Sequence, residues 1–265
     1  MKVGGVILLI LGVALVIWHI LSRKKMGSLL RARVTTVDEL KSTAQTLQSE
    51  LGSGGMSEFV AISGTIDCAS PLISPLAERP CAYYKMEIKR KYEEQRTKRD
   101  SEGNVRHETH RGTQTMSTQS EGRDFDLVSG GGAIPVRIDG ISHSALQETV
   151  DQFQPGESGG ASLSYGLFSM HIPSLGHGSR TLGYQYEEHI LPLDGQFTVI
   201  GQVSDNAGLL SLGRGGPLFS ISRRSRDEQI GTAKNTAKYT AIGSGVSLVT
   251  GVALLIIHFL TAAVA

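Results

Sequence analysis

The sequence contains few of the residues that build metal centres and disulfide frameworks. Only two cysteines, Cys68 and Cys81, occur in 265 residues. Two thiols cannot provide the four ligands of a cysteine-rich zinc site. They can form a disulfide only if the fold brings their Cα atoms within about 7 Å of each other. We therefore expect two reduced and largely buried thiols, and we predict neither a metal nor another cofactor.

Net charge and aromatic residues are also low. The chain has a net charge of +1 and 6% aromatic residues, whereas it has 32 glycines. A near-neutral balance gives no indication of a nucleic-acid partner. Abundant glycine is typical of turn-rich β structure and of closely packed membrane helices.

Motifs of the common enzyme classes are missing. There is no Gly-x-Ser-x-Gly element, and the glycines of Leu212–Pro217 lack the Lys-Ser/Thr ending of a P-loop, so a turn is expected there. Cys81 lies at the start of a predicted strand rather than at a helix amino terminus, which disfavours a reactive thiol. The histidines follow no metal-binding or catalytic spacing and are interpreted as solvated or scattered loop residues: His107, His110, His171, His177 and His189. We predict no catalytic residue.

Two long apolar runs lie near the ends of the chain. Val3–Leu21 and Ala241–Ala265 contain no charged residue. About 20 residues of α-helix cross the hydrocarbon layer of a bilayer, so both runs predict transmembrane helices. A cleaved signal peptide is the alternative for the first run, but the basic residues follow the run and no small-residue cleavage site appears.

The basic residues that flank these runs predict a topology. The first run is followed by Arg23, Lys24, Lys25, Arg31 and Arg33. The second run is preceded by Arg223, Arg224, Arg226, Lys234 and Lys238. The positive-inside rule places residues 22–240 in the cytoplasm and both termini outside, in a plasma (inner) membrane. Arg23, Lys24, Lys25, Arg223, Arg224 and Arg226 either determine topology alone or also bind lipid headgroups.

Two helices outside the apolar runs are expected. The first is an amphipathic helix, predicted from apolar residues at spacings of three and four: Val37, Leu40, Ala44, Leu47 and Leu51. Thr36 and Glu39 have the spacing of a capping box at its start. The helix is expected to end at Gly52, and Gly52–Gly55 to form a flexible joint. This helix is either a spacer packed on the β domain or an interfacial or coiled-coil contact. Ser225 and Glu228 repeat the capping-box spacing and predict a helix that continues into the second apolar run.

Small residues recur every four positions within the second run. Gly243, Ser247 and Gly251 predict close helix packing, either against the first run, which carries Gly5 and Gly12, or against a second copy of the chain.

Between the helices the pattern changes to that of β structure. From Ala82 to Lys89, successive side chains alternate between apolar and polar, which predicts a half-buried strand. The polar segment Gln95–Gly122, with a turn signal at 100–104, predicts a long hairpin. Further strands are expected at Ser57–Asp67, Phe125–Ile141, Tyr184–Val203 and Leu218–Ser222. For Gln152–Arg180 we predict no helix or strand.

The predicted fold is an α+β membrane protein. A mainly antiparallel β domain, a small barrel or sandwich, lies between two transmembrane helices and is joined by one amphipathic helix. The expected segments are a first transmembrane helix with its basic flank (1–24), an amphipathic helix and joint (25–56), the β domain (57–222), a helical juxtamembrane segment (223–240) and a second transmembrane helix (241–265).

The order of these elements resembles the GIDE domain, also called BAM for "beside a membrane". The resemblance rests on an early element, Gly64, Pro71, Ser74, Pro80, Cys81, Tyr83 and Tyr84, and on Phe125–Ile138, Leu191–Val203 and Leu218–Ser222. The family is named from a mitochondrial RING-type ubiquitin ligase that holds this domain in the intermembrane space, and it includes prokaryotic membrane proteins. The resemblance implies a membrane-side domain. Ligase activity is not carried over, because a RING needs about eight Cys or His ligands.

Three hypotheses of function remain open. The first is a non-enzymatic scaffold that binds a protein partner at the cytoplasmic membrane surface, with self-association through the helices as a further contact. The second is an accessory or relic component of a ubiquitin-ligase-like system. The third is a hydrolase with an unrecognised site. The hairpin tip, 100–106, is the expected contact for a partner.

Overall fold

The computed structural model describes residues 2–51, 56–99, 105–138, 145–156, 162–171, 179–206 and 208–264. They form two compact units, Met1–Ser63 with Phe197–Ala265, and Gly64–Gln196. We call them the helical unit and the hairpin unit. The five consecutive segments expected from the sequence are a different division, and they stay a prediction.

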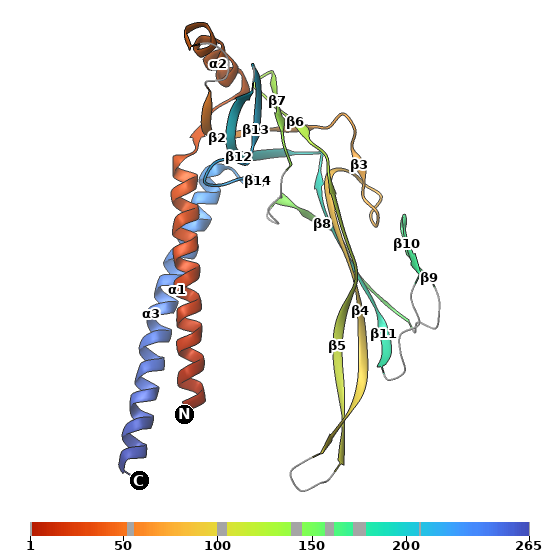
Figure 1. The fold of residues 1–265 in the computed structure, drawn as a ribbon, viewed down its shortest axis with the longest axis vertical. Coiled ribbons are helices and arrows are strands. Elements are labelled where there is room, and N and C mark those ends of the chain that lie inside the picture. Colours follow the sequence, from red (N-terminus) through yellow and green to blue (C-terminus); the bar gives the residue numbers. More distant parts are fainter. Residues whose placement is uncertain are drawn as a thin grey trace. The chain divides into compact units, whose positions relative to one another are not determined.

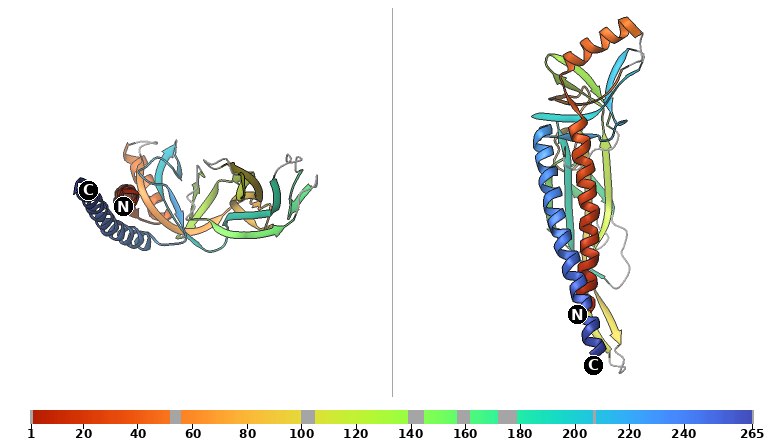
Figure 2. Two further views of the ribbon diagram at one scale, coloured as in Figure 1. Left: turned by 90° about the horizontal axis from the view of Figure 1, so that it is seen from below. Right: turned by 90° about the vertical axis from the view of Figure 1, so that its left-hand side faces the viewer.

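Two long helices dominate the helical unit. Helices α1 (Lys2–Arg31) and α3 (Arg226–Val264) lie side by side and run in opposite directions (Figures 1 and 2). Gly5, Gly12 and His19 follow one another at intervals of seven on α1, a spacing typical of coiled coils. An added Cβ at Gly12 would lie 2.7 Å from the side chain of Leu248. Any larger residue at this close approach would force the Leu248 side chain to shift.

Both helices are long and apolar enough to cross a membrane, over Gly4–Arg31 and Arg226–Ile257. Their outward faces carry large apolar side chains: Ile10 is 65% exposed and Val249 is 71% exposed. Side chains of this kind cost free energy in water, whereas lipid accommodates them. The helices thus indicate a membrane protein.

Helix α1 is longer than expected from its apolar run. The run ends at Leu21, but the helix continues through the basic flank to Arg31. The flank contains no proline, and its Arg, Lys, Met and Leu residues are good helix formers. Helix α3 runs without interruption from Arg226, as the Ser225–Glu228 pattern predicts. Its capping box is reciprocal: Glu228 N donates to Ser225 Oγ at 3.2 Å, and Ser225 N to Glu228 Oε2 at 2.8 Å.

The strands of the helical unit lie directly on the ends of these helices. Strand β1 (Arg33–Val34) pairs in parallel with β2 (Ser57–Asp67), and β2 also pairs with β12 (Gln196–Asn206). Strand β12 pairs antiparallel with β13 (Leu209–Gly213) and β14 (Ser220–Ser222). One apolar cluster joins helices and strands, formed by Leu29, Ala32, Ala61, Ile200 and Ala233.

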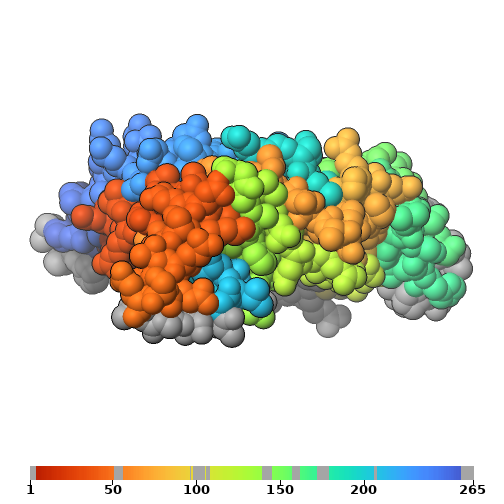
Figure 3. Space-filling model, turned by 90° about the horizontal axis from the view of Figure 1, so that it is seen from above, coloured from red at the N-terminus to blue at the C-terminus, as the bar shows by residue number. Residues whose placement is uncertain are grey.

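The predicted amphipathic helix is α2 (Val37–Leu51), which lies at the surface (Figure 3, orange). Val37 and Leu40 are fully buried, whereas Ala44 and Leu47 are half-buried. Glu39 N donates to Thr36 Oγ1 at 3.3 Å, which is one half of the expected capping box. The Glu39 carboxylate accepts instead from Thr35 Oγ1 at 2.8 Å. The predicted joint Gly52–Gly55 lies outside the described residues.

The hairpin unit contains part of a first sheet, a second sheet of five strands and a separate sheet of two strands. The end of β2 pairs with β6 (Phe125–Ser129), which forms a tight hairpin with β7 (Gly132–Val136). Gly130 and Gly131 adopt φ of 66° and 91°, as a two-residue hairpin turn requires. The second sheet has the order β3 (Leu72–Ile73), β4 (Pro80–Arg99), β11 (Ser179–Pro192), β8 (Gln147–Pro155), and β5 (Val105–Gly122) pairs with β4.

The core of the hairpin unit lies on one face of this second sheet. Met86 and Ile88 on β4 and Tyr186 on β11 are fully buried there, and Tyr165 stacks on Tyr186 with ring centroids 4.8 Å apart. Tyr165 belongs to a separate two-stranded sheet of β9 (Ser162–Tyr165) and β10 (Phe168–His171). The alternation predicted from Ala82 onward is confirmed.

The predicted α+β class, the mostly antiparallel strands and the two apolar terminal helices are confirmed. Strand β2 pairs with β12 in addition to its neighbours in the linear strand order, which is a closure of the β-barrel type. The sequence analysis predicted no helix or strand in the stretch 152–180, and this was its main omission. Its described part contains the end of β8 and the β9–β10 hairpin.

Candidate functional site

The early motif folds into a tight turn between β3 and β4. Ser74 is fully buried, and its Oγ accepts a hydrogen bond from Arg79 N at 3.1 Å. The backbone closes the same turn, because Ser74 N donates to Arg79 O at 2.9 Å. Glu78 adopts a positive φ of 55° inside it. Pro71 and Pro80 are exposed on either side, so they shape the turn rather than the core.

A buried glutamate on β11 holds this turn in place. The Glu188 side chain is fully buried, and its carboxylate accepts hydrogen bonds from Leu76 N at 2.7 Å and Ala77 N at 3.1 Å. Thr149 Oγ1 on β8 donates a third bond at 2.8 Å. A buried carboxylate is tolerated only when several donors satisfy it, and here three do. Sequence reasoning missed Glu188, whose only signal is a charge at an inward position of an alternating strand.

Both cysteines are free thiols. Cys81 is fully buried at the start of β4, and Cys68 is half-buried, with its Sγ 3.9 Å from Asp124 O. Burial is the largest cause and the negative charge of Glu188 the next largest; together they raise the pKa of Cys81 to about 12. Cys81 is thus a neutral thiol near pH 7, which suits neither a nucleophile nor a metal ligand.

The remaining motif residues pack between strands. An added Cβ at Gly64 would lie 2.2 Å from Val128 O, so only glycine fits where β2 passes β6. Tyr83 and Tyr84 are half-buried on β4. Burial raises the pKa of Tyr84, and the neighbouring Glu121 carboxylate adds to this effect. The early motif thus builds a turn and a strand pairing, with no reactive group at its centre.

A second polar cluster lies further along β4. The Arg90 side chain is buried, and its guanidinium donates to Thr181 Oγ1 at 2.7 Å and to Ser179 Oγ at 2.9 Å. The guanidinium also lies 5.0 Å from the centre of the Tyr92 ring. Tyr92 in turn covers Gly112 on β5, where an added Cβ would lie 2.7 Å from the ring. Arg90 thereby ties β4 to β11 and fixes where the hairpin leaves the sheet.

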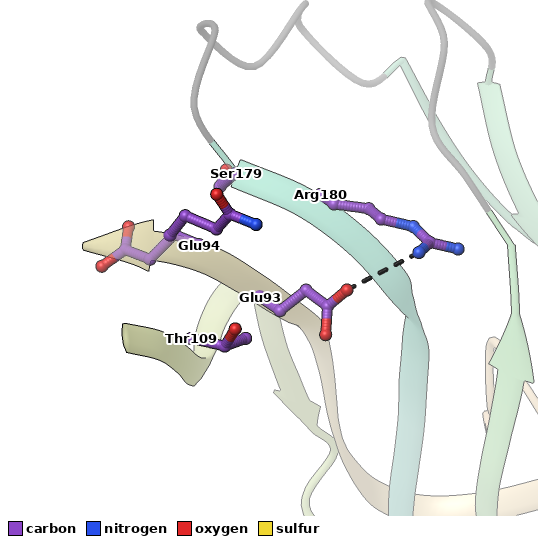
Figure 4. A pocket seen from close by; sticks show the side chains of 6 residues that line it. Glu93, Glu94, Thr109, Ser179 and Arg180 are labelled. Carbon is purple, nitrogen blue, oxygen red and sulfur yellow. Dashed lines mark ion pairs between the residues drawn. The ribbon is translucent and has the colours of Figure 1, made fainter. Parts of the chain in front are cut away.

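An open groove begins just beyond this cluster (Figure 4). Its lining side chains are Glu93, Glu94, Gln95, Thr109, Ser179 and Arg180. Glu93 points toward Arg180, with their charged atoms 3.6 Å apart, and toward Arg111 at the same distance. Ion pairs of this kind at the surface contribute little stability. The groove is a polar surface with both signs of charge, suited to contact with a polar chain.

Where the structure describes them, the histidines singled out in the sequence are spread over β5, β10 and β11. His107 and His110 both lie on β5, His171 is exposed at the end of β10, and His177 lies outside the described residues. His189 on β11 lies 3.9 Å from the Glu148 carboxylate. Among the described residues, no group of three or more His, Cys, Asp or Glu side chains could hold a metal ion.

The basic residues predicted to face lipid fall into two groups. Arg23, Lys24 and Lys25 are exposed on α1. The arginines before α3 contact the protein: Arg226 Nε donates to Leu29 O at 3.0 Å, and the Arg223 guanidinium lies 5.3 Å from the Phe197 ring centre. Arg224 Nη1 donates to Thr232 Oγ1 at 3.4 Å.

The predicted small residues of α3 lie toward α1 within the same chain. An added Cβ at Gly251 would lie 3.1 Å from the Leu9 side chain, and one at Gly243 would lie 3.4 Å from Leu15. Ser247 is half-buried between them in sequence. The predicted hairpin tip has its centre, 100–104, outside the described residues.

A comparison with known protein families gives a match. The family model GIDE, described as E3 ubiquitin ligase, matches residues 93–256, which is more than half of the chain. The match runs from the far part of β4 into α3, and the turn around Ser74 and Cys81 precedes it. No curated protein and no solved structure matches the chain.

Proposed function

The chain belongs to the GIDE family, and we propose that it is a membrane-anchored protein that binds a protein partner by adding a strand to β5. The observation that carries the proposal is the free outer edge of this strand. Among the described strands, β5 pairs only with β4. Extended peptides recognise such edges through main-chain hydrogen bonds.

The composition of β5 supports an edge that accepts a partner. Natural proteins protect edge strands with lysine, proline or bulges. From Gly112 to Ser120, β5 has no charged residue and no proline. Thr113, Thr115 and Thr118 on this stretch are exposed. The pairing of β5 with β4 shifts register once here, between Ile88–Ser117 and Lys89–Thr115, which leaves Met116 as a bulge. An edge without charge or proline on either side of this bulge favours pairing with another chain.

The far part of the hairpin extends past the sheet. Among the described residues, β11 accompanies β4 as far as Glu94, which pairs with Ser179. Beyond it, β4 and β5 continue as a two-stranded ribbon to the pair Arg99–Val105. Two-stranded ribbons are marginally stable alone in water. A partner strand would therefore stabilise the ribbon as it binds.

The membrane anchor follows from α1 and α3, and the proposed topology follows from their flanking charges. Basic residues gather at the ends of both helices that adjoin the strands. We propose that residues 22–240 lie in the cytoplasm at the plasma (inner) membrane, with both termini outside. Labelling of an introduced cysteine at exposed Ser120 by a membrane-impermeant maleimide in intact cells would contradict this topology.

The partner proposal is tested by shortening the ribbon. Glu94 and His110 are paired, so an Asn-Gly turn can replace residues 95–109 and leave the rest of the sheet intact. The full chain and this variant are crosslinked in membranes, extracted, purified and compared by quantitative mass spectrometry. A variant with Lys41→Ser and Glu50→Ser, two exposed positions on α2, is the matched control.

We expect one protein to accompany the full chain and the control and to be depleted at least about tenfold from the shortened variant. Recovery of the chain alone would contradict strand addition at β5. Equal recovery with the shortened variant would contradict a contact at the ribbon and confine any partner to the retained edge Gly112–Ser120.

The description of the family favours a second candidate, an accessory role in a ubiquitin-ligase-like system. The same experiment distinguishes it, because a partner with transferase or RING motifs would support this role. The third hypothesis, a hydrolase, gains no support from the buried neutral thiol of Cys81 or from the positions of the described histidines.

A further inference from the structure

A band of exposed basic side chains surrounds the two-helix stem next to its apolar part. It consists of Arg23, Lys24 and Lys25 on α1 and Lys234 and Lys238 on α3, and we call it the basic collar. We propose that the basic collar binds the headgroups of anionic phospholipids. The proposal rests on the proposed membrane anchoring of the chain and adds a preference for one class of lipid.

Two contacts between the helices show that the members of the collar share one level of the stem. His19 Nδ1 lies 2.8 Å from Ala237 O, and Arg226 Nε donates to Leu29 O at 3.0 Å. Arg23, Lys24, Lys25 and Lys234 fall between these two contacts, and Lys238 lies one residue outside them. Five positive charges are therefore gathered within a few turns of two packed helices.

No carboxylate neutralises the collar from the helices themselves. Helix α1 contains no acidic residue, and α3 contains none after Glu228. The nearby Asp227 and Glu228 lie in the first turn of α3, and Glu228 accepts a bond from Ser225 N as part of the helix cap. None of the five collar side chains makes an ion pair with a described residue. The band thus presents net positive charge, which is complementary to an anionic membrane surface.

Aromatic residues mark the adjoining level as the membrane interface. Trp18 is 61% exposed on α1, and Tyr239 is 70% exposed on α3. Trp and Tyr are enriched at the headgroup level of bilayers. Trp18 precedes Arg23 by five residues, which is about 7.5 Å along the helix. The collar is therefore placed where headgroup phosphates lie.

Three other arginines near the stem contact the protein. Arg33 pairs with Glu58 at 2.7 Å, and Arg223 and Arg226 contact Phe197 and Leu29. They serve the fold of the helical unit. The collar residues have no such role, so their side chains are available to ligands.

Trp18 is the only tryptophan of the chain and provides a direct assay. The full chain is reconstituted into vesicles of phosphatidylcholine and phosphatidylglycerol, in which either one or the other lipid carries brominated acyl chains. Bromine quenches tryptophan fluorescence at short range, so the two quenching curves report the lipid composition around Trp18. We expect at least about a fivefold preference for phosphatidylglycerol, which weakens as salt is raised.

Variants test whether the collar causes this preference. Lys234→Gln with Lys238→Gln is expected to reduce it, and the further change of the three collar residues on α1 to Gln is expected to abolish it. Lys41→Gln with Arg79→Gln, two exposed cations outside the collar, is the matched control and is expected to retain it.

The outcomes separate the two proposals. Absence of quenching by either brominated lipid would show that α1 is not in the bilayer, and the anchoring proposal would fail with it. Equal quenching by both lipids would leave the anchor in place and overturn the collar proposal. A preference that inorganic phosphate abolishes at constant ionic strength would also overturn it, because the occupant would then be free phosphate.

Discussion

Replacement of Glu188 by alanine is expected to loosen the turn between β3 and β4. The change removes a fully buried carboxylate and leaves three donors without their acceptor: Leu76 N, Ala77 N and Thr149 Oγ1. Each buried donor left unpaired costs about 1–3 kcal/mol. Ala77 N and Thr149 Oγ1 are only partly buried, so their costs lie at the low end. The free energy of unfolding is expected to fall by about 3–5 kcal/mol.

Hydrogen exchange at the turn measures this loss where it occurs. A local destabilisation of 3 kcal/mol corresponds to at least about 100-fold faster exchange of the Leu76 and Ala77 amides. Glu187→Ala is the matched control, because Glu187 is the neighbour on the opposite face of β11 and forms a half-exposed ion pair with Lys89. That pair contributes about 0–1 kcal/mol. Equal exchange in the two variants would refute the role of Glu188 as the support of the turn.

Three further predictions concern other parts of the fold. At pH 8, iodoacetamide is expected to modify Cys68 and spare Cys81 in the folded chain, as mass spectrometry of the two peptides would show. The pKa of Cys81 is raised to about 12 in the folded chain but is about 8.5 when unfolded. Its neutral thiol therefore stabilises the fold below pH 8.5, and this contribution is lost as the pH rises toward 12. Denaturant titrations of wild type and Cys81→Ala should converge in that range, and parallel curves would contradict the assignment. Gly64→Ala is expected to lower the free energy of unfolding, measured by denaturant titration, by about 1–3 kcal/mol, because the new Cβ meets Val128 O. Gly27→Ala, with open space around it, should be neutral or stabilising. Gly12→Leu is expected to separate α1 from α3, measured as loss of the disulfide between Leu9→Cys and Gly251→Cys, and Gly4→Leu should leave that crosslink intact.

Those elements whose pattern is local were predicted from the sequence. The two apolar runs, the amphipathic helix α2 and the alternating strand β4 each show a period that belongs to one type of structure. The Ser225–Glu228 capping box also marks the start of α3 correctly. In these cases the neighbouring residues carry the information, so the tertiary structure adds little.

The elements that depend on distant partners were missed. Strands β8, β9 and β10 have weak local patterns, and β8 is defined by its pairing with β11. Glu188 and Arg90 look like ordinary surface charges in the sequence. They are buried because backbone amides near Leu76 and hydroxyls near Ser179 come to them from far along the chain. No spacing rule identifies partners of this kind.

The motif residues illustrate a second limit. Ser74, Cys81 and Gly64 are recognisable in the sequence, but a recognisable motif does not reveal whether it builds a site or a turn. The structure shows a turn closed by Ser74 and supported by Glu188, with a buried neutral thiol beside it. The surface proposed for function lies instead on β5, where the sequence shows mainly polar residues and the open edge follows from the strand order.

Site-specific photocrosslinking from β5 tests the central claim most directly. A photoreactive amino acid is placed singly at Thr113, Thr115 and Thr118 on the exposed edge, and at exposed Asp126 on β6 as the control. Strand addition predicts one common crosslinked protein from the positions on β5 in intact membranes, and none from Asp126. An absence of crosslinks along β5, or the same products from Asp126, would contradict a partner at this edge.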